Sequence, residues 1–235
     1  MKSPSPKANK WEDHYSRLAR KENFPARSVY KLQEIQEKFR LIKKGDRILD
    51  LGCSPGSWTL YASDLAGEKG MITGIDLKKV EIKIPSNVRI YNCDIIEIDD
   101  KLLSSIGRDF NVVISDMAPA TTGNKSADAA RSYDLCVAAL DIAKEALVPG
   151  GSFLCKIFQG EDFKKFSEMV RAAFNTKKIF KPQSSRKASR EIYVVGLGLK
   201  ESRIRGSSDR KSQRIHRRSQ HTLFLPGESI SDGPM

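Results

Sequence analysis

Four charged residues stand where predicted core elements begin or end, and together they could act on a hydroxyl group. A strand predicted at 111–115 leads directly to Asp116, and the next predicted strand ends at Lys156. If these strands are neighbours in a parallel sheet, their carboxyl ends lie about 5 Å apart. A reversed strand beginning at Glu191 would reach the same edge, and Lys31 would reach it from an early helix. Two amines and two carboxylates in one cleft could orient a hydroxyl oxygen or remove its proton.

The charge state of Lys156 decides which of these roles it could take. An ordinary lysine, with a pKa of about 10.4, is protonated at neutral pH and cannot act as a base. Burial and the ammonium of Lys31 would lower this pKa, whereas Asp116 and Glu191 would raise it. Lys156 is therefore either a neutral base or a charged group that orients the oxygen. Taken singly, a lysine at a strand end is more often a surface residue, and an aspartate there a turn or capping residue.

A second group of residues is suited to hold a nucleoside cofactor. The predicted strand 47–51 runs into a turn with Gly52 and Gly56, where the backbone can bend tightly and approach a ligand. Asp76 ends the next strand and could accept hydrogen bonds from both ribose hydroxyls. Asp94 follows the third strand and could accept from an exocyclic amine such as that of adenine. These groups fit S-adenosylmethionine, which has a ribose, an adenine and an amino-acid head but no pyrophosphate.

The spacing of the glycines argues against a nicotinamide-dependent oxidoreductase. It is Gly-x-x-x-Gly, whereas dinucleotide-binding turns have Gly-x-Gly-x-x-Gly. A glycine pair alone would more often be a plain structural turn, and each acid alone could be a solvated turn residue. Their occurrence at three successive strand ends favours a cofactor site.

Short apolar runs alternate with helical patterns along most of the chain, which predicts an α/β fold. The near-continuous Val, Ile and Leu strands indicate a mostly parallel sheet with helices on both faces. The polar loop at 182–190 is too short for a parallel crossover, so one of the last strands should be reversed. Seven strands are expected, at 47–51, 71–75, 88–91, 111–115, 152–156, 178–181 and 191–197. Helices are expected at 27–39, 58–66, 102–106, 126–147 and 161–173.

The excess positive charge is concentrated near the two ends of the chain. The net charge is +12, and residues 1–40 contribute ten Lys/Arg against five Asp/Glu, while residues 200–235 contribute eight against four. Basic segments on a near-neutral body suit a polyanionic partner such as RNA, although they could simply aid solubility. We expect a basic, partly disordered arm at 1–25, a folded domain at 26–199 and a disordered basic tail at 200–235.

The cysteines and histidines give no sign of a metal site. The four cysteines contain no Cys-x-x-Cys pair and only three histidines could join them, so no metal is expected and the thiols should be buried. No signal peptide or membrane-spanning run is recognisable, which predicts a cytoplasmic protein. We expect a monomer.

Five motifs together resemble the FtsJ-like ribose 2′-O-methyltransferases, over roughly residues 11–199. The resemblance implies a Rossmann-like, S-adenosylmethionine-dependent methyltransferase fold and a catalytic Lys-Asp-Lys-Glu tetrad at Lys31, Asp116, Lys156 and Glu191. It also implies cofactor contacts at Gly56, Trp58, Asp76, Asp94 and Asp116. The motifs are Ala26–Leu32, Asp50–Trp58, Ser115–Pro119, Cys155–Gly160 and Ser189–Tyr193.

The usual substrate of this family is a uridine ribose in large-subunit ribosomal RNA, while relatives act on tRNA or mRNA caps. A non-catalytic RNA-binding module with the same fold is a further alternative, which the complete tetrad opposes. The tail after residue 200 has no counterpart in the family pattern. RNA is expected to contact the basic tail and a group of N-terminal side chains: Lys10, Arg17, Arg20, Lys21 and Arg27, with Trp11, His14 and Tyr15 as possible stacking groups.

Overall fold

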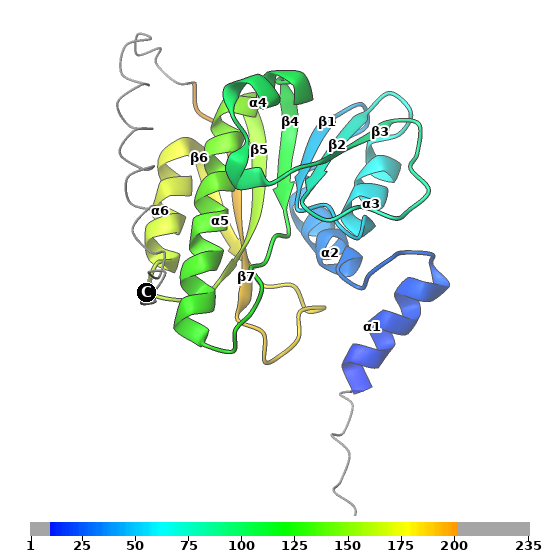
Figure 1. Cartoon of the computed structure of the whole chain (residues 1–235), viewed down its shortest axis with the longest axis vertical. Helices are drawn as coiled ribbons and strands as arrows, with labels where there is room; N and C mark the ends of the chain where they lie inside the picture. Colours follow the sequence, from blue (N-terminus) through cyan, green and yellow to red (C-terminus); the bar gives the residue numbers. More distant parts are fainter. Residues whose placement is uncertain (1–9, 202–235) are drawn as a thin grey trace, which may run out of the picture. The chain divides into compact units, whose positions relative to one another are not determined.

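A seven-stranded sheet forms the centre of the molecule, with strand order β3-β2-β1-β4-β5-β7-β6. This is a computed structural model, and it describes residues 10–201 (Figure 1). The strands are β1 (Arg47–Leu51), β2 (Met71–Asp76), β3 (Val88–Asn92), β4 (Phe110–Ser115), β5 (Leu147–Phe158), β6 (Phe174–Phe180) and β7 (Glu191–Leu199). The helices are α1 (Lys10–Lys21), α2 (Val29–Phe39), α3 (Ser57–Ala66), α4 (Asp100–Ile106), α5 (Lys125–Ala146) and α6 (Phe163–Ala173), with a 3₁₀ turn η1 at Ile95–Glu97.

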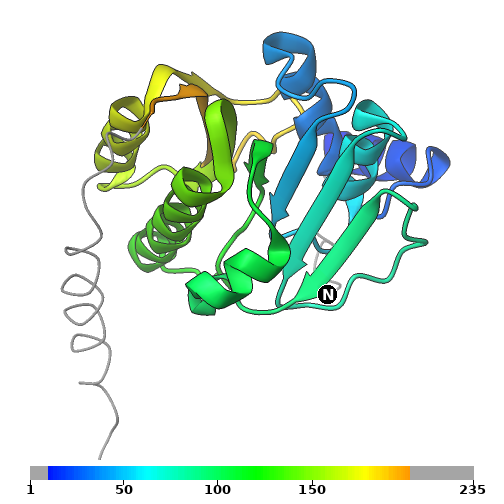
Figure 2. The same ribbon diagram turned by 90° about the horizontal axis from the view of Figure 1, so that it is seen from above.

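The predicted mostly parallel sheet with one reversed strand is confirmed. Strands β1 to β5 pair in parallel, whereas β7 runs antiparallel to both of its neighbours, β5 and β6. One apolar core lies between the sheet and helices α4, α5 and α6, and a second lies between the sheet and helices α2 and α3. Figures 1 and 2 show these two helical layers on opposite faces of the sheet.

Strands β5 and β6 and helix α1 differ from the sequence prediction; β6 begins at Phe174 rather than at residue 178. Strand β5 begins at Leu147 rather than at residue 152, because Gly150 adopts a positive φ of 81° and lets the chain bend while it stays in the sheet. Helix α1 was not predicted, and it lies within the arm expected at 1–25. Ala19 of α1 is buried against Val29 and Tyr30, so this helix has a small apolar core of its own. Residues 1–9 and 202–235 of the predicted arm and tail lie outside the described residues.

Local capping explains where several helices begin. The Asn124 side chain accepts hydrogen bonds from the first backbone N–H groups of α5, and the Asp99 side chain accepts one from the first turn of α4.

Three cysteines, Cys53, Cys136 and Cys155, are buried free thiols as expected, while Cys93 is half-buried.

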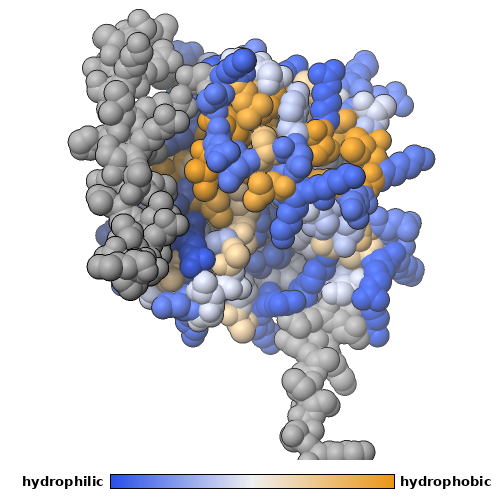
Figure 3. Space-filling model, viewed as in Figure 1, coloured by the Kyte–Doolittle hydropathy of each residue, from blue (hydrophilic) through white to orange (hydrophobic). Residues whose placement is uncertain are grey.

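The carboxyl edge of the sheet collects the residues that the sequence singled out. Ser115 pairs with Cys155, so Asp116 and Lys156 follow on neighbouring strands. Because β7 is reversed, its first residue, Glu191, pairs with Phe158 near the end of β5. In the view of Figure 1 this edge lies in the lower half of the domain, where the surface in Figure 3 is mainly hydrophilic; the apolar side chains of that face gather in its upper half.

Candidate active site

Lys156 and Asp116 form a largely buried ion pair at the carboxyl ends of β5 and β4. The Lys156 Nζ atom lies 2.9 Å from Asp116 Oδ1 and also donates a hydrogen bond to the backbone carbonyl of Asp116. Two of the three directions around this nitrogen are therefore taken by one residue. The remaining direction is available to a substrate hydroxyl.

Lys31 and Glu191 form a second ion pair beside the first. The Lys31 Nζ atom of α2 lies 2.8 Å from Glu191 Oε2 at the start of β7. The two pairs are neighbours, because the charge of Lys31 acts on Asp116 as well as on Glu191. The four residues predicted from the sequence thus lie together at one edge of the sheet.

Tyr193 contacts the first of these pairs and had no predicted role. Its hydroxyl donates a hydrogen bond of 2.6 Å to Asp116 Oδ1, and its fully buried ring stacks on Trp58. A period of two along a strand places Tyr193 on the same face as Glu191, and this signal could have identified it.

The charges around Asp116 keep its carboxylate ionised. Burial alone would raise the pKa of Asp116, but Lys156, Lys31 and the hydrogen bond from Tyr193 outweigh it, so the pKa is lowered. Burial and the nearby Asp116 raise the pKa of Tyr193 well above its ordinary value, so Tyr193 remains a neutral hydrogen-bond donor. The site therefore holds a fixed negative charge next to the nitrogen of Lys156.

Asp76 ties the end of β2 to the glycine-rich turn. Its Oδ2 accepts from the Ser54 N–H at 2.9 Å and its Oδ1 accepts from the Lys78 N–H at 2.7 Å. Asp94 caps η1 by accepting from the Ile96 N–H through Oδ1, and within residues 10–201 its Oδ2 accepts no hydrogen bond. Both carboxylates keep lone pairs that a ligand could use.

Two exposed apolar side chains flank these acids and were missed in the sequence. Leu77, which follows Asp76, is 68% exposed, and Ile96, which lies two residues after Asp94, is 62% exposed. Large apolar residues one or two positions after acids that end or follow successive strands are the signal that could have found them. Their exposed surfaces are suited to the faces of an aromatic base.

The other predicted cofactor residues lie at the start of α3. Gly56 precedes this helix with a φ of 109°, and no side chain caps the first N–H groups. A side chain at Gly56 would meet the side chain of Ile82 in the loop between β2 and β3, and the positive φ itself favours glycine there. The Trp58 ring is buried and its indole N–H donates to the Ser28 carbonyl at 2.8 Å, which leaves its backbone N–H as the group that could face a ligand.

A buried carboxylate, Asp50, lies beneath the glycine-rich turn and was also missed. It is 1% exposed; its Oδ2 accepts from the Thr59 hydroxyl at 2.7 Å, and its Oδ1 has no partner. Burial, together with the charges of Asp116 and Asp76, raises its pKa to about 7. An acid between Leu49 and Leu51, within a strand of mainly apolar residues, was the signal available in the sequence.

Helix α2 clamps the loop that ends at Glu191. Both carboxylate oxygens of Glu34 accept backbone N–H groups, from Gln183 at 2.6 Å and from Ser184 at 2.7 Å. Because Lys31 lies one turn earlier on the same helix, this clamp sets the register of the Lys31–Glu191 pair. We therefore assign Glu34 a positioning role.

Replacing Glu34 with glutamine should lower kcat roughly 10-fold or more without changing cofactor affinity. The amide group of glutamine would face a backbone N–H that needs an acceptor, so the loop must shift, and small displacements of catalytic groups are costly. Initial rates at saturating substrate and calorimetric cofactor titration measure the two effects. Glu37→Gln, an exposed position on the same helix, is the matched control; equal kcat values in both variants would contradict the assignment.

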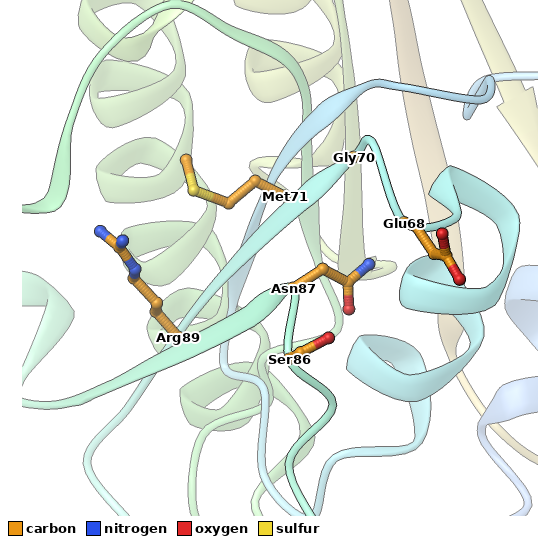
Figure 4. Close-up of a pocket in the computed structure, with 6 residues that line it drawn as sticks. All are labelled: Glu68, Gly70, Met71, Ser86, Asn87 and Arg89. Carbon is orange, nitrogen blue, oxygen red and sulfur yellow. The ribbon is translucent and has the colours of Figure 1, made fainter.

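One further hollow lies away from this site. Its volume is about 190 Å³, and it is found at the amino ends of β2 and β3, opposite the tetrad. Figure 4 shows Met71 and Arg89 projecting from these strands, with Asn87 on their other side. Asn87 is engaged in the fold, since it is hydrogen-bonded to the Ser63 hydroxyl and the Gly67 carbonyl.

Within residues 10–201, no group of three or more His, Cys, Asp or Glu side chains could hold a metal ion.

Comparison with known proteins agrees with this geometry. The family model described as FtsJ-like methyltransferase matches residues 24–199. A protein of Desulforapulum autotrophicum named "Ribosomal RNA large subunit methyltransferase E" is 55% identical over 195 residues, which cover 83% of this chain and 96% of the relative. One of the same name from Desulfosudis oleivorans is 52% identical, covering 88% of this chain and 100% of the relative.

Solved structures agree as well. A crystal structure from Plasmodium falciparum, named as a ribosomal RNA methyltransferase, superimposes with a TM-score of 0.68 at 27% identity and covers 76% of this chain and 100% of that chain. The resemblance noted in the motifs is therefore confirmed, together with the methyltransferase fold. The chain belongs to the FtsJ-like methyltransferase family.

Proposed function

We propose that this methyltransferase uses S-adenosylmethionine to methylate a ribose 2′-hydroxyl, in a uridine of large-subunit ribosomal RNA. The observation that carries the proposal is the meeting of the Lys156–Asp116 and Lys31–Glu191 pairs at the edge where Asp76 ends β2 and Asp94 follows β3. The names of the relatives support ribosomal RNA of the large subunit as the substrate. The choice of uridine comes from the family resemblance alone.

The residues present fit S-adenosylmethionine. The unpartnered Oδ1 of Asp50 suits the ammonium of its amino-acid head, and the open start of α3 at Trp58 suits the carboxylate of that head. Asp76 suits the ribose hydroxyls, and Asp94 suits the adenine amine, with Leu77 and Ile96 against the base. When bound, the cofactor supplies an electrophilic methyl group on a sulfonium.

The protein's own task is then to hold the ribose oxygen in line and to accommodate its proton. Lys156 Nζ has one direction left for that oxygen, since Asp116 takes the other two. If that direction carries an N–H, Lys156 orients the oxygen lone pair; if it carries a lone pair, Lys156 takes the proton. Glu191 and Lys31 complete the polar wall around the hydroxyl. This is catalysis mainly by positioning.

Exposed positive charge on α1 and in the loop before Glu191 supports an RNA substrate. Arg20 and Lys21 lie exposed in the last turn of α1, and Arg186 and Lys187 lie exposed in the loop before Glu191. The predicted stacking group Tyr15 is engaged, because its ring contacts Arg27 and Tyr30, whereas His14 is exposed. The side chains of Lys10 and Trp11, also expected to contact RNA, lie outside the described part of the structure.

Replacing Arg20 and Lys21 together with glutamine should weaken RNA binding and reduce its salt dependence. Each lost phosphate contact removes about 0.7 from the slope of log affinity against log salt for a single strand. Fluorescence anisotropy at several salt concentrations measures the slope. This substitution is cleaner than deleting residues 1–20, because Ala19 belongs to the small core around α1.

The matched control is Lys43→Gln/Lys44→Gln, two exposed lysines before β1 at the opposite edge of the sheet. We expect the control to leave the slope unchanged. An equal change in both pairs would mean that the basic residues of α1 act only through net charge.

The proposed function is tested by mapping 2′-O-methyl groups in RNA from cells with and without this protein. Loss of one methyl group from large-subunit RNA, restored by the purified protein with labelled cofactor, is the expected result. Loss from tRNA or an mRNA cap would change the substrate, and no transfer to any RNA would leave only a binding role.

Among residues 10–201 no helix is long and apolar enough to cross a membrane. We propose a cytoplasmic monomer, which cell fractionation and light scattering check.

A further inference from the structure

Three buried polar atoms without partners gather near the tetrad. Six such side-chain atoms occur among the described residues, and three of them are Arg27 Nη1, Ser184 Oγ and Ser185 Oγ. Ser184 is 1% exposed and Ser185 is 7% exposed, so water does not reach them freely. Buried donors without partners weaken a fold, and their concentration at one place requires an explanation.

These atoms belong to a region that the rest of the structure holds in place. Arg27 Nη2 donates to the Ser184 carbonyl at 2.6 Å, which joins the guanidinium to the loop that carries both serines. The Arg27 guanidinium carbon lies 5.3 Å from the centre of the Tyr15 ring, and the Glu34 carboxylate accepts a hydrogen bond from the Ser184 N–H. The two N–H bonds of Arg27 Nη1 and the two serine hydroxyls thus have no partner in this network.

The chemistry of this cluster suits a singly charged oxyanion. A guanidinium and two hydroxyls can all donate, and arginine in particular matches the oxygens of a phosphate. The loop at 181–190 carries only positive charges and no acid: Lys181, Arg186, Lys187 and Arg190. Such a surface repels cations and attracts anions.

The cluster is connected along the chain to both members of the Lys31–Glu191 pair. Arg27 precedes Lys31 by four residues and lies in the turn before α2, where its backbone carbonyl accepts from the Tyr30 N–H at 3.3 Å. The loop that carries both serines ends at Glu191, which pairs with Lys31. In RNA, a phosphodiester is attached to the ribose carbon next to the one that carries the 2′-hydroxyl. When the 2′-hydroxyl is at the tetrad, this phosphodiester would therefore lie close to these donor groups.

We propose that Arg27, Ser184 and Ser185 form a subsite for the RNA phosphodiester next to the methylated ribose. This inference rests on the proposed function, since it places the phosphate relative to the hydroxyl at Lys156. Because the donors are buried in the free protein, binding must shift the loop enough to admit a phosphate oxygen. The loop would then fix the substrate strand and Glu191 at the same time.

The first test is the double variant Ser184→Ala/Ser185→Ala in the full chain. Since these hydroxyls have no partner in the free protein, the midpoint of thermal unfolding should stay the same or rise. The KM for unmethylated large-subunit ribosomal RNA should rise roughly 5-fold or more, because hydrogen bonds to a charged group are lost. The Kd for S-adenosylmethionine should not change. Ser63→Ala is the matched control, because its buried hydroxyl is bonded to Asn87, so it should lower the unfolding midpoint and leave KM unchanged.

The second test is Arg27→Gln, measured by RNA binding rather than turnover. Loss of one phosphate contact should reduce the salt slope by about 0.7, and Lys44→Gln should not change it. An unchanged KM in the serine variant with an unchanged slope in Arg27→Gln would overturn the subsite and leave a buried water as the partner of these atoms. If the wild-type protein transferred no methyl group to RNA, the proposed function would fail, while the salt slope would still report on the phosphate contact.

Discussion

Replacing Lys156 with alanine is expected to reduce kcat by a factor of about 10³ or more while the Kd for S-adenosylmethionine stays nearly the same. Lys156 is the side chain whose nitrogen has one free direction at the carboxyl edge, and positioned proton-transfer or orienting groups contribute about 10² to 10⁴ in rate. The residues proposed to hold the cofactor lie elsewhere, such as Asp76 at the end of β2 and Asp94 after β3. Single-turnover transfer of a labelled methyl group measures the rate, and calorimetry measures cofactor binding.

The variant has a structural consequence that the experiment must separate from chemistry. Without Lys156, Asp116 loses its nearest positive partner, and a buried charge left alone destabilises a fold. The double variant Lys156→Met/Asp116→Asn removes both charges, so it should fold well and still be inactive. Lys177→Ala, a partly buried lysine on β6 that is bonded to Ser167, is the control that should lose stability but not turnover. Near-normal turnover in folded Lys156→Ala would overturn the assignment.

The pH dependence of the wild-type rate then distinguishes the two roles of Lys156. A neutral base requires the deprotonated amine, so kcat would rise with pH through the pKa of the working complex. A charged orienter requires the protonated amine, so kcat would fall through that pKa. Asp116, whose pKa is lowered, remains ionised throughout and contributes to neither limb near neutral pH.

Residues at the ends of regular elements were predictable from the sequence. Asp116 follows a strongly apolar strand, Lys156 lies near the end of one and Glu191 begins one, and strand pairing fixes where such ends meet. The reversed strand was predictable because the loop before Glu191 is too short for a crossover. The pairing of Lys31 with Glu191 agrees with the expected convergence, although its 2.8 Å contact depends on packing that no local pattern specifies.

Residues whose role depends on what lies across the core were not predictable. Tyr193 looks like an ordinary strand residue until its hydroxyl is seen to contact Asp116. Trp58 was expected at the cofactor from family resemblance, but its ring is enclosed between elements and only its backbone could serve. Helix α1 was missed because its apolar face is short and pairs only with Val29, Tyr30 and their neighbours.

The burial of the Asp50 carboxylate destabilises the fold, but it places a negative charge where a cation could bind. Its carboxylate is enclosed, accepts one hydrogen bond from Thr59 and has one oxygen without a partner. The neighbouring carboxylates Asp116 and Asp76 also oppose its ionisation. A protein selected for stability alone would not place an acid there. The arrangement is explained if the ammonium of the bound cofactor supplies the missing partner.

We therefore expect Asp50→Asn to stabilise the protein at pH 8 and to weaken S-adenosylmethionine binding at least 10-fold. The folded pKa of about 7 lies above the ordinary value of 3.8, so folding favours the protonated acid. The resulting stability is fully present below pH 3.8 and is lost as the pH rises through about 7. Between these two pH values the free energy of unfolding falls by at most about 4 kcal/mol. Asparagine avoids this loss, although its amide leaves one group without a partner. Thermal unfolding at pH 5 and pH 8 measures the difference, which should be larger at pH 8.

Cofactor affinity provides the independent half of this test. Because an ammonium favours ionised Asp50, binding to the wild-type protein should release a proton and become tighter as the pH rises through 7, whereas Asp50→Asn should lose this pH dependence. Asp46→Asn is the control: burial also raises the pKa of Asp46, but it precedes β1 at the opposite edge, so cofactor binding should be unaffected. If Asp50→Asn bound the cofactor normally and were less stable than the wild type at pH 8, Asp50 would instead be a structural acid that supports the turn through Thr59.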